Sequence, residues 1–359
     1  MVKGDNSSND PPMNWNYIGN AAAVALLRSH VAHGSLRQAY LFSGPSGVGR
    51  RTLALRFAQA VNCLNPPQAG EFCGVCRACH LLAEMRHPDL EIVAAEQRGG
   101  ILRVEQIREL QHRLSLSPYE GRYRIALILR FEEANLNAQN ALLKTLEEPP
   151  PKVILLITVE DSENLLPTIV SRCEVVRLRP LAAEALAQTL IEKQAAEAPL
   201  AAQVARLAGG RAGIALRLLH HPEERQRQFQ VIEDHLRLLG SSYLDRFATA
   251  ERYARELNKA EITLLLDAWL AFWRDVTLYA HQDRQHLTYP DFQDAVAAIV
   301  AKIGEERSLQ ALRQIHQMRQ VLQGNVNLRL ALEVLFLNLP NLSLPQSATQ
   351  SALEEAQTP

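Results

Sequence analysis

Short apolar runs that alternate with helical patterns constrain the fold of the first half of this chain more than any other feature. The candidate strands cover residues 40–43, 90–94, 124–129, 153–159 and 174–178. Helical patterns begin near Arg51, repeat through Val104, Ile107, Leu110 and Leu114, and cover residues 138–148. Apolar strands separated by helices are typical of a parallel sheet covered on both faces. The sequence therefore predicts an α/β domain.

After Pro180 the strand signal ends and helical patterns continue. An apolar stripe with steps of three and four runs through Ile262, Leu266, Trp269, Trp273, Val276 and Ala280, which is typical of a buried helix face. We interpret the two tryptophans as core or subunit-interface residues. The predicted parts are an α/β domain (14–180), a small helical segment (181–224) and a helical bundle (225–340). The polar ends, 1–13 and 341–359, are predicted to be disordered tails.

The charges are nearly balanced, with 38 Lys plus Arg against 39 Asp plus Glu and a net charge of −1. This excludes a basic surface over the whole chain, so any nucleic-acid contact must come from a local patch or from partner proteins. The longest apolar runs are far shorter than the roughly 20 residues that span a bilayer, so we expect no membrane contact. The N-terminal sequence has no secretory pattern, and we expect a cytoplasmic protein.

Four of the five cysteines lie close together, at Cys63, Cys73, Cys76 and Cys79. Cysteines separated by two residues direct both sulfurs at one ion, and four thiolates suit tetrahedral zinc. Because four sulfur ligands leave no open coordination position, we predict a structural zinc. Either of the nearby histidines, at positions 80 and 87, is an alternative ligand, but we favour places beside the ligands or on the surface for both.

A glycine-rich loop with Gly44, Gly47 and Gly49 lies between the first strand and the following helix. Such glycines let backbone N–H groups surround phosphates, and a lysine followed by serine or threonine completes the site. Here Arg50 stands in the lysine position and Arg51 in the serine or threonine position, while Thr52 supplies a hydroxyl one position too late. Arginine does not replace this lysine and cannot hold magnesium. We predict a degenerate phosphate loop with weak or no nucleotide binding.

The third strand lacks the acidic residues that would help to hold a metal ion at its end. Leu129 and Arg130 occupy these positions, while Glu132 and Glu133 follow shortly after. For these two glutamates we favour solvated positions at a helix start over metal binding. Two independent losses therefore predict that the chain does not hydrolyse ATP on its own.

Together these motifs resemble those of the bacterial clamp-loader AAA+ subunits of DNA polymerase III. The matching elements are residues 39–44 (AYLFSG), the four-cysteine insertion, 87–90 (HPDL), 140–150 (NALLKTLEEPP) and Ser171-Arg172-Cys173. The likeness extends from about residue 15 to 219, and 325–332 resembles the C-terminal collar of that family. It implies an AAA+ parallel-sheet domain with a zinc-binding insertion (63–79), a helical lid (181–224) and a helical collar (225–340).

The family contains ATP-hydrolysing motor subunits, a clamp-opening subunit and a member that keeps the fold without a working nucleotide site, which this sequence resembles. The resemblance implies that Arg172 reaches the γ-phosphate of ATP on a neighbouring subunit, and that Cys173 packs its loop. Thr158 matches the polar sensor position of the motors, and Gly213 stands where they carry a lid arginine. The implied partners are the gamma or tau and delta subunits, the sliding clamp, and primed DNA reached through the complex.

Two alternatives remain open from the sequence. The first is an ATP-hydrolysing motor of the gamma/tau kind with an unusual loop, and the substitutions at Arg50, Arg51, Leu129 and Gly213 stand against it. The second is a zinc-bearing nucleic-acid-binding module. The cysteine segment contains only one basic residue, Arg77, which is too little positive charge for binding dominated by phosphate contacts.

Overall fold

The structure is a computed structural model and describes residues 15–322, 324 and 326–342. The predicted tail 1–13, most of 341–359, and residue 325 of the collar motif lie outside the described residues. The chain divides into two compact units, residues 1–195 with 210–214 and residues 196–209 with 215–359. The division falls within the segment predicted as a lid, so the lid and collar boundaries stay predictions.

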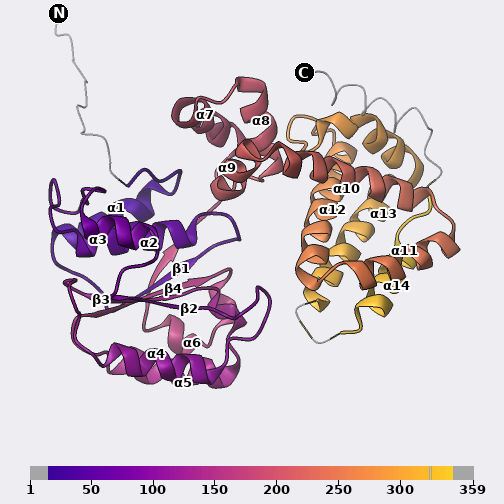
Figure 1. Cartoon of the computed structure of the whole chain (residues 1–359). Helices are drawn as coiled ribbons and strands as arrows, with labels where there is room; N and C mark the ends of the chain where they lie inside the picture. The colour runs from indigo at the N-terminus through magenta and orange to yellow at the C-terminus, as the bar shows by residue number, and fades with distance from the viewer. Residues whose placement is uncertain (1–14, 323, 325, 343–359) are drawn as a thin grey trace, which may run out of the picture. The chain divides into compact units, whose positions relative to one another are not determined.

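The first unit is built on a five-stranded parallel sheet with the strand order β2-β3-β4-β1-β5 (Figure 1). The strands are β1 (Ala39–Ser43), β2 (Leu90–Val93), β3 (Arg124–Ile128), β4 (Val153–Val159) and β5 (Glu174–Arg177). Strands β1, β3 and β4 are buried along their whole length. Burial on both faces explains why their sequences are apolar without alternation. The predicted parallel α/β domain is confirmed.

Helices cover both faces of this sheet (Figure 1). One face carries α1 (Ala21–Ala32), α2 (Arg50–Asn62) and α3 (Arg77–Ala83), and the other carries α4 (Val104–Leu114), α5 (Leu136–Glu147) and α6 (Pro167–Val170). Successive side chains of a strand point to opposite faces, so Tyr40 packs with Phe57 of α2, whereas Leu41 belongs to the core cluster that includes Leu142 of α5. Helix α7 (Ala183–Gln194) follows the last strand.

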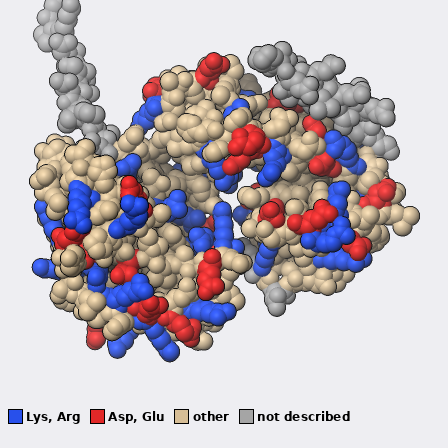
Figure 2. Space-filling model, viewed as in Figure 1, with Lys and Arg blue, Asp and Glu red and all other residues tan. Residues whose placement is uncertain are grey.

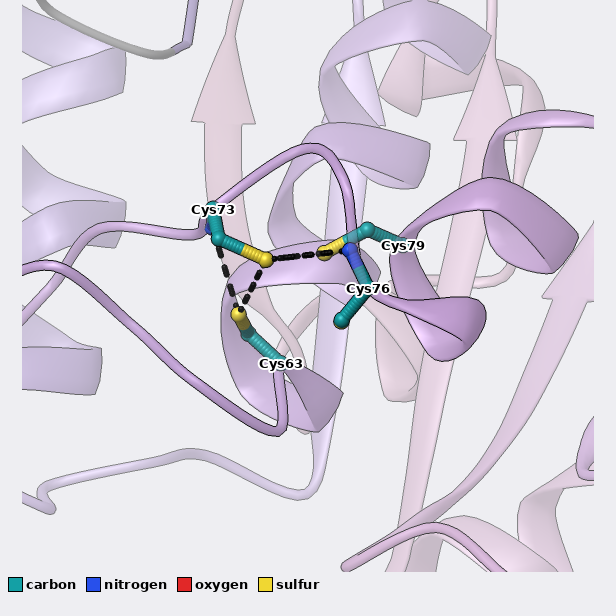
Figure 3. A group of neighbouring side chains, drawn as sticks. All are labelled: Cys63, Cys73, Cys76 and Cys79. Atoms are coloured by element: carbon teal, nitrogen blue, oxygen red, sulfur yellow. Dashed lines mark hydrogen bonds between the residues drawn. The ribbon is translucent and has the colours of Figure 1, made fainter.

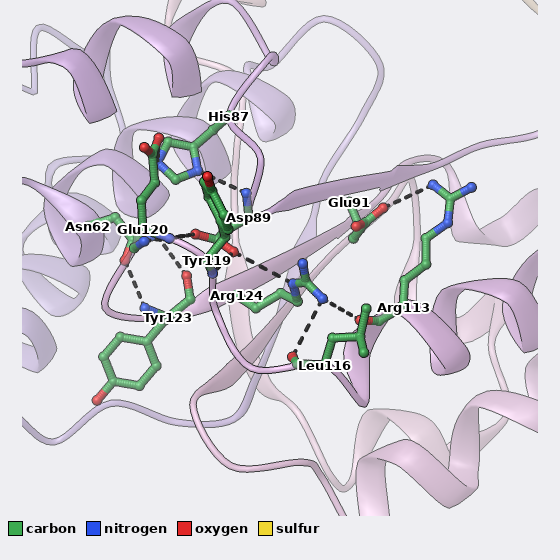
Figure 4. Close-up of polar contacts among 11 residues, drawn as sticks. Asn62, His87, Asp89, Glu91, Arg113, Leu116, Tyr119, Glu120, Tyr123 and Arg124 are labelled. Atoms are coloured by element: carbon green, nitrogen blue, oxygen red, sulfur yellow. Dashed lines mark hydrogen bonds and ion pairs between the residues drawn. The ribbon is translucent and has the colours of Figure 1, made fainter.

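A buried carboxylate organises the loop between α4 and β3 (Figure 4). The oxygens of Asp89 accept hydrogen bonds from the backbone N–H groups of Tyr119 (2.6 Å), Glu120 (2.9 Å) and Gly121 (2.7 Å). Burial alone would raise the pKa of Asp89, but these three donors hold it below its ordinary value. Arg124 of β3 lies 3.8 Å from the same carboxylate. The 87–90 motif therefore has a structural role in this chain.

The second unit is helical, and within the residues described no helix is both long and apolar enough to cross a membrane. Its helices are α8 (Ala198–Leu207), α9 (Ala212–His220, whose first turn belongs to the first unit), α10 (Pro222–Gly240), α11 (Tyr243–Glu256), α12 (Lys259–Ala280), α13 (Gln293–Val321) and α14 (Leu328–Asn338). Acidic and basic side chains are interspersed on the surface that Figure 2 shows. This mixture agrees with the nearly balanced charge of the chain.

The centre of this unit is an aromatic cluster around a buried histidine. Trp269 and Trp273 of α12 are buried, which confirms their interpretation as core residues. The indole N–H of Trp273 donates a hydrogen bond to His235 Nε2 (2.8 Å), and the His235 ring packs on Trp269 with centroids 4.1 Å apart. Burial, reinforced by the charge of Arg246, lowers the pKa of His235 to about 3. The imidazole is therefore neutral in the folded chain.

A buried arginine ties the last helix to the rest of the unit. The guanidinium of Arg246 donates hydrogen bonds to the carbonyls of Leu239 (2.9 Å), Phe336 (2.6 Å), Leu339 (2.8 Å) and Pro340 (2.9 Å). These carbonyls lie at the C-terminal ends of α10 and α14, where the helix dipoles favour a positive charge. One side chain thus satisfies carbonyl groups that the two helices leave without partners.

We predict that the protein becomes less stable as the pH decreases, because of His235. In the unfolded chain the histidine binds a proton below pH ~6.5, whereas in the folded chain it does so only near its lowered pKa of about 3. The free energy of unfolding therefore decreases as the pH falls through this range. From pH 7.0 to 5.5 this loss amounts to about 1 kcal/mol. The variant His235→Gln should not show this loss when its stability is measured by urea unfolding. Glutamine still accepts the Trp273 hydrogen bond but does not titrate.

Asp275, whose pKa burial raises to about 6, opposes this trend in both proteins, so the difference between the two chains isolates His235. The exposed His316 provides the control, since His316→Gln should keep the wild-type dependence. Equal pH dependence in wild type and His235→Gln would contradict the prediction.

Candidate functional site

The four clustered cysteines converge on one point of the first unit (Figure 3). Their sulfur atoms all lie within 4.8 Å of one another, with 3.5 Å between Cys63 and Cys73 and 3.9 Å between Cys73 and Cys79. Sulfur atoms around tetrahedral zinc are about 3.8 Å apart, because each Zn–S bond is about 2.3 Å long. The cluster therefore has the dimensions of a four-sulfur metal site.

Helix ends place these sulfurs. Cys63 follows the last residue of α2, Cys76 caps the N-terminus of α3, and Cys79 lies in the first turn of α3. The backbone N–H groups of Cys73 and Cys76 donate to the sulfurs of Cys63 and Cys73, each over 3.2 Å. Such N–H donors stabilise thiolate ligands, so these residues fit a metal ion. Bound there, the ion would tie α2 to α3 and have no open position for catalysis.

Neither nearby histidine belongs to the group of sulfurs. His80 is exposed on α3. A surface position was one of the two places that we favoured for it. His87 is buried, accepts the backbone N–H of Asp89 at Nδ1 (3.1 Å), and has Nε2 3.6 Å from a Glu120 oxygen. Burial lowers the pKa of His87. His87 therefore belongs to the Asp89 network of Figure 4.

We predict that the purified protein contains zinc and that Cys79→Ser loses it. Removing one of four ligands opens the site and should lower the free energy of unfolding by ~2 kcal/mol or more, because metal binding and folding are coupled. Metal content can be measured by elemental analysis and stability by urea unfolding. Cys173→Ser is the matched control and should keep its zinc, since Cys173 lies outside the cluster. Equal zinc in Cys79→Ser and wild type would contradict the assignment.

The glycine-rich loop connects β1 to α2 and is closely covered by protein atoms. Gly47 and Gly49 have φ values of +83° and +107°, a backbone region that favours glycine. A Cβ atom would lie 2.4 Å from Ile214 at Gly47 and 2.6 Å from the Tyr17 hydroxyl at Gly49. That hydroxyl donates to the Val48 carbonyl (2.9 Å). The loop thus has a backbone that favours glycine at two positions, and side chains pack directly against it.

Arg50 is the first residue of α2 and lies near the residues that follow β3 and β4. Its side chain is only 9% exposed, and its guanidinium lies 3.9 Å from Glu132 and 3.7 Å from Glu160. These glutamates follow β3 and β4, the two strands nearest to β1 on that side. Burial lowers the pKa of Arg50 and raises that of Glu132, and the Arg50–Glu132 attraction opposes both shifts. A side chain of the protein itself therefore supplies positive charge here.

The two glutamates after the third strand differ from the sequence-based expectation. They begin a short 3-10 helix, as expected, but they are not solvated: Glu132 is 19% exposed and Glu133 is 10% exposed. Glu133 accepts hydrogen bonds from Arg130 Nε (2.9 Å) and from the Gly99 backbone N–H (2.8 Å). Two of their partners, Arg50 and Gly99, come from segments far away in the sequence, which a local pattern does not reveal.

The hydroxyl groups near the loop have different surroundings. Arg51 and Thr52 are both exposed on α2. Thr158 is buried at the end of β4, where its hydroxyl oxygen accepts the Arg130 backbone N–H (2.9 Å) and fixes the turn after β3. Ser46 accepts a hydrogen bond from Arg98 (2.8 Å), a contact that sequence reasoning did not identify.

The start of α9 lies against the same loop. The backbone N–H of Gly213 donates to the carbonyl of Gly47 (2.8 Å), and a Cβ atom at Gly213 would lie 2.8 Å from that oxygen. Gly213 thus provides a backbone contact where the motor subunits of the resembled family carry an arginine. The close approach requires glycine and leaves no side chain to reach a nucleotide.

We predict that Arg50 stabilises the fold, unlike its exposed neighbour Arg51. Arg50→Ala would leave Glu132 and Glu160 without their cation and should lower the free energy of unfolding by about 2 kcal/mol. Arg51→Ala should change it by less than about 0.5 kcal/mol. Urea unfolding of the two variants beside wild type measures both values. Similar small effects at the two positions would mean that the Arg50 ion pairs contribute little.

Arg172 lies between α6 and β5, at the opposite edge of the sheet from the glycine-rich loop. Its side chain is 36% exposed and is held by the Thr168 carbonyl (2.8 Å) and by Glu147 (2.8 Å). Cys173 is partly buried, and burial raises the pKa of its thiol to about 12. The thiol is therefore protonated and suited to packing rather than reaction, as its predicted role requires.

The strand order, the glycine-rich loop between β1 and α2, and the helix seated on that loop define a protein of the AAA+ class. A family model described as "DNA polymerase III, delta subunit" matches residues 19–182. DNA polymerase III subunit delta′ of Pseudomonas aeruginosa is 32% identical over 338 residues, which are 92% of this chain and 96% of that protein. The Bacillus subtilis subunit delta′ is 27% identical over 88% of this chain and 94% of that protein.

The chain therefore belongs to the delta′ family of DNA polymerase III clamp-loader subunits. The tau subunit of Escherichia coli is 35% identical, but the match covers 54% of this chain and 30% of that protein. The gamma/tau alternative thus fits less well than delta′, whose relatives match nearly the full length.

Proposed function

We propose that this chain is the non-hydrolysing, stationary subunit of a clamp loader that places the sliding clamp on primed DNA. The observation that carries this proposal is the state of the glycine-rich loop. Arg50 stands in place of the lysine and is paired with Glu132 and Glu160 in the space that ATP and magnesium would need. An edge whose charges are balanced internally has little affinity for a further triphosphate. Its own nucleotide site is therefore empty or weak.

The second part of the proposal is that Arg172 acts on ATP bound by a neighbouring gamma or tau subunit. Its guanidinium is partly exposed and lies at the edge of the sheet away from the chain's own loop. An arginine supplied in trans offsets charge on the transferred phosphoryl group and can raise the rate by ~10³ or more. The Glu147 carboxylate holds the guanidinium until a phosphate replaces it as the partner.

The remaining parts of the proposal follow from these roles. The cysteine cluster binds structural zinc, and the helical second unit provides the collar that joins the subunits. The delta subunit, the clamp and DNA are partners through the assembled complex, and the protein works in the cytoplasm. Turnover of ATP belongs to the motor subunits, while this chain positions one arginine.

We predict that Arg172→Ala assembles normally but lowers DNA- and clamp-stimulated ATP hydrolysis by the reconstituted complex at least about twofold. The rate at the one ATP site that this arginine serves should fall much further. The overall decrease is smaller because the other ATP sites of the complex continue to hydrolyse ATP. Arg86→Ala is the matched control, because Arg86 is also an exposed arginine paired with a glutamate, over 3.1 Å. The isolated wild-type chain should show no turnover above background.

Two outcomes would contradict the proposal. Full stimulation by Arg172→Ala would remove the role of this arginine in trans. Turnover by the isolated chain that disappears in Arg50→Ala would show a working nucleotide site and revive the motor alternative.

A further inference from the structure

A pocket of about 280 Å³ opens at the edge of the sheet where β1 and β5 begin. Its polar lining includes Arg37, Thr145, Ser171, Arg172 and Glu174. Two of these side chains carry guanidinium groups, and only Arg172 has a role in the function proposed above. The second guanidinium, on Arg37, precedes β1 and is not part of any motif noted in the sequence.

The strand register brings these two arginines to one place. Tyr40 of β1 pairs in parallel with Glu174 of β5. In parallel strands the residues that precede a matched pair enter the sheet side by side. Arg37 lies three residues before Tyr40, and Arg172 lies two residues before Glu174. Both arginines therefore lie just before adjacent strands, at the rim of the same pocket.

The backbone that carries Arg37 is held rigidly. Its N–H donates to the hydroxyl of Tyr40 (2.9 Å), and that hydroxyl also shares a hydrogen bond with His30 Nδ1 (3.0 Å). Tyr40 is completely buried. The carbonyl of the next residue, Gln38, accepts the N–H of Leu155 in β4 (2.8 Å). The backbone of Arg37 is therefore fixed beside the pocket, which restricts where its guanidinium can reach.

The charge of Arg37 is less fully compensated than that of Arg172. Arg37 is 66% exposed, and its Nε atom lies 3.8 Å from a Glu174 oxygen, beyond hydrogen-bond distance. Arg172 is 36% exposed and makes a 2.8 Å contact with Glu147. Arg37 is therefore the more available of the two for an anionic partner.

We propose that Arg37 is a second arginine acting in trans, and that it contacts the phosphates of the same nucleotide that Arg172 serves. This inference rests on the proposed role of Arg172. A nucleoside triphosphate carries several negative oxygens, and a guanidinium binds phosphate through paired hydrogen bonds. Arg172 meets the phosphoryl group that is transferred, while Arg37 meets phosphate charge that is present before and during the reaction. Arg37 therefore strengthens ATP binding more than it accelerates cleavage.

The test is the ATP dependence of hydrolysis by the reconstituted complex of this chain with its own organism's motor subunits, delta subunit, clamp and primed DNA. Arg37→Ala should raise KM about fivefold with kcat within about twofold, because ground-state binding is lost. Arg172→Ala should instead lower kcat. Arg37→Lys should give an intermediate KM, since it keeps the charge but not the paired hydrogen bonds. Arg86→Ala, the exposed control, should leave both constants unchanged.

The outcomes separate this inference from the proposed function. A wild-type KM for Arg37→Ala, together with a lowered kcat for Arg172→Ala, would overturn the inference alone. No effect of Arg172→Ala would overturn the proposed function and the inference with it.

Discussion

The parallel hydrogen bonding of β1 with β4 and β5 is the constraint on which the residue groups at both edges of the sheet depend. Where β1 ends, the chain turns into the glycine-rich loop and Arg50 reaches the glutamates that follow β3 and β4. Where β1 and β5 begin, Arg37 and Arg172 enter one pocket. Because all five strands run in the same direction, these two groups of residues lie at opposite edges of the sheet. Arg50 lies among glutamates at one edge, and two arginines line a pocket at the other.

Contacts within the chain hold both the glycine-rich loop and the Arg50 side chain. A buried cation is costly unless carboxylates compensate its charge, and Glu132 and Glu160 do so around Arg50. Tyr17 and Ile214 pack on the loop itself. In the function proposed above, these contacts within the chain take the place of the contacts that ATP makes in a motor subunit, and the unit has a stationary role.

How far the sequence predicts this site differs between its parts. The cysteine cluster was predicted in full, because C-x2-C steps determine sulfur positions over a few residues. The five strands and the loop were also predicted from apolar runs and glycines close together in the chain. Glu132 was expected to be solvated, and its pairing with Arg50 was missed. Arg37 carried no signal at all, since a single arginine before a strand is ordinary and only strand order shows what lies beside it.

The sequence by itself determined the fold class, the sulfur ligands and the loss of the lysine and hydroxyl that a phosphate loop requires. These properties depend on residue type and on spacing along the chain, which sequence displays directly. Only the tertiary structure decided which carboxylates compensate Arg50 and that Arg37 shares a pocket with Arg172. The physical reason is that ion pairs and pockets join segments far apart in sequence. Their partners are selected by strand order and register, and only the folded sheet defines both.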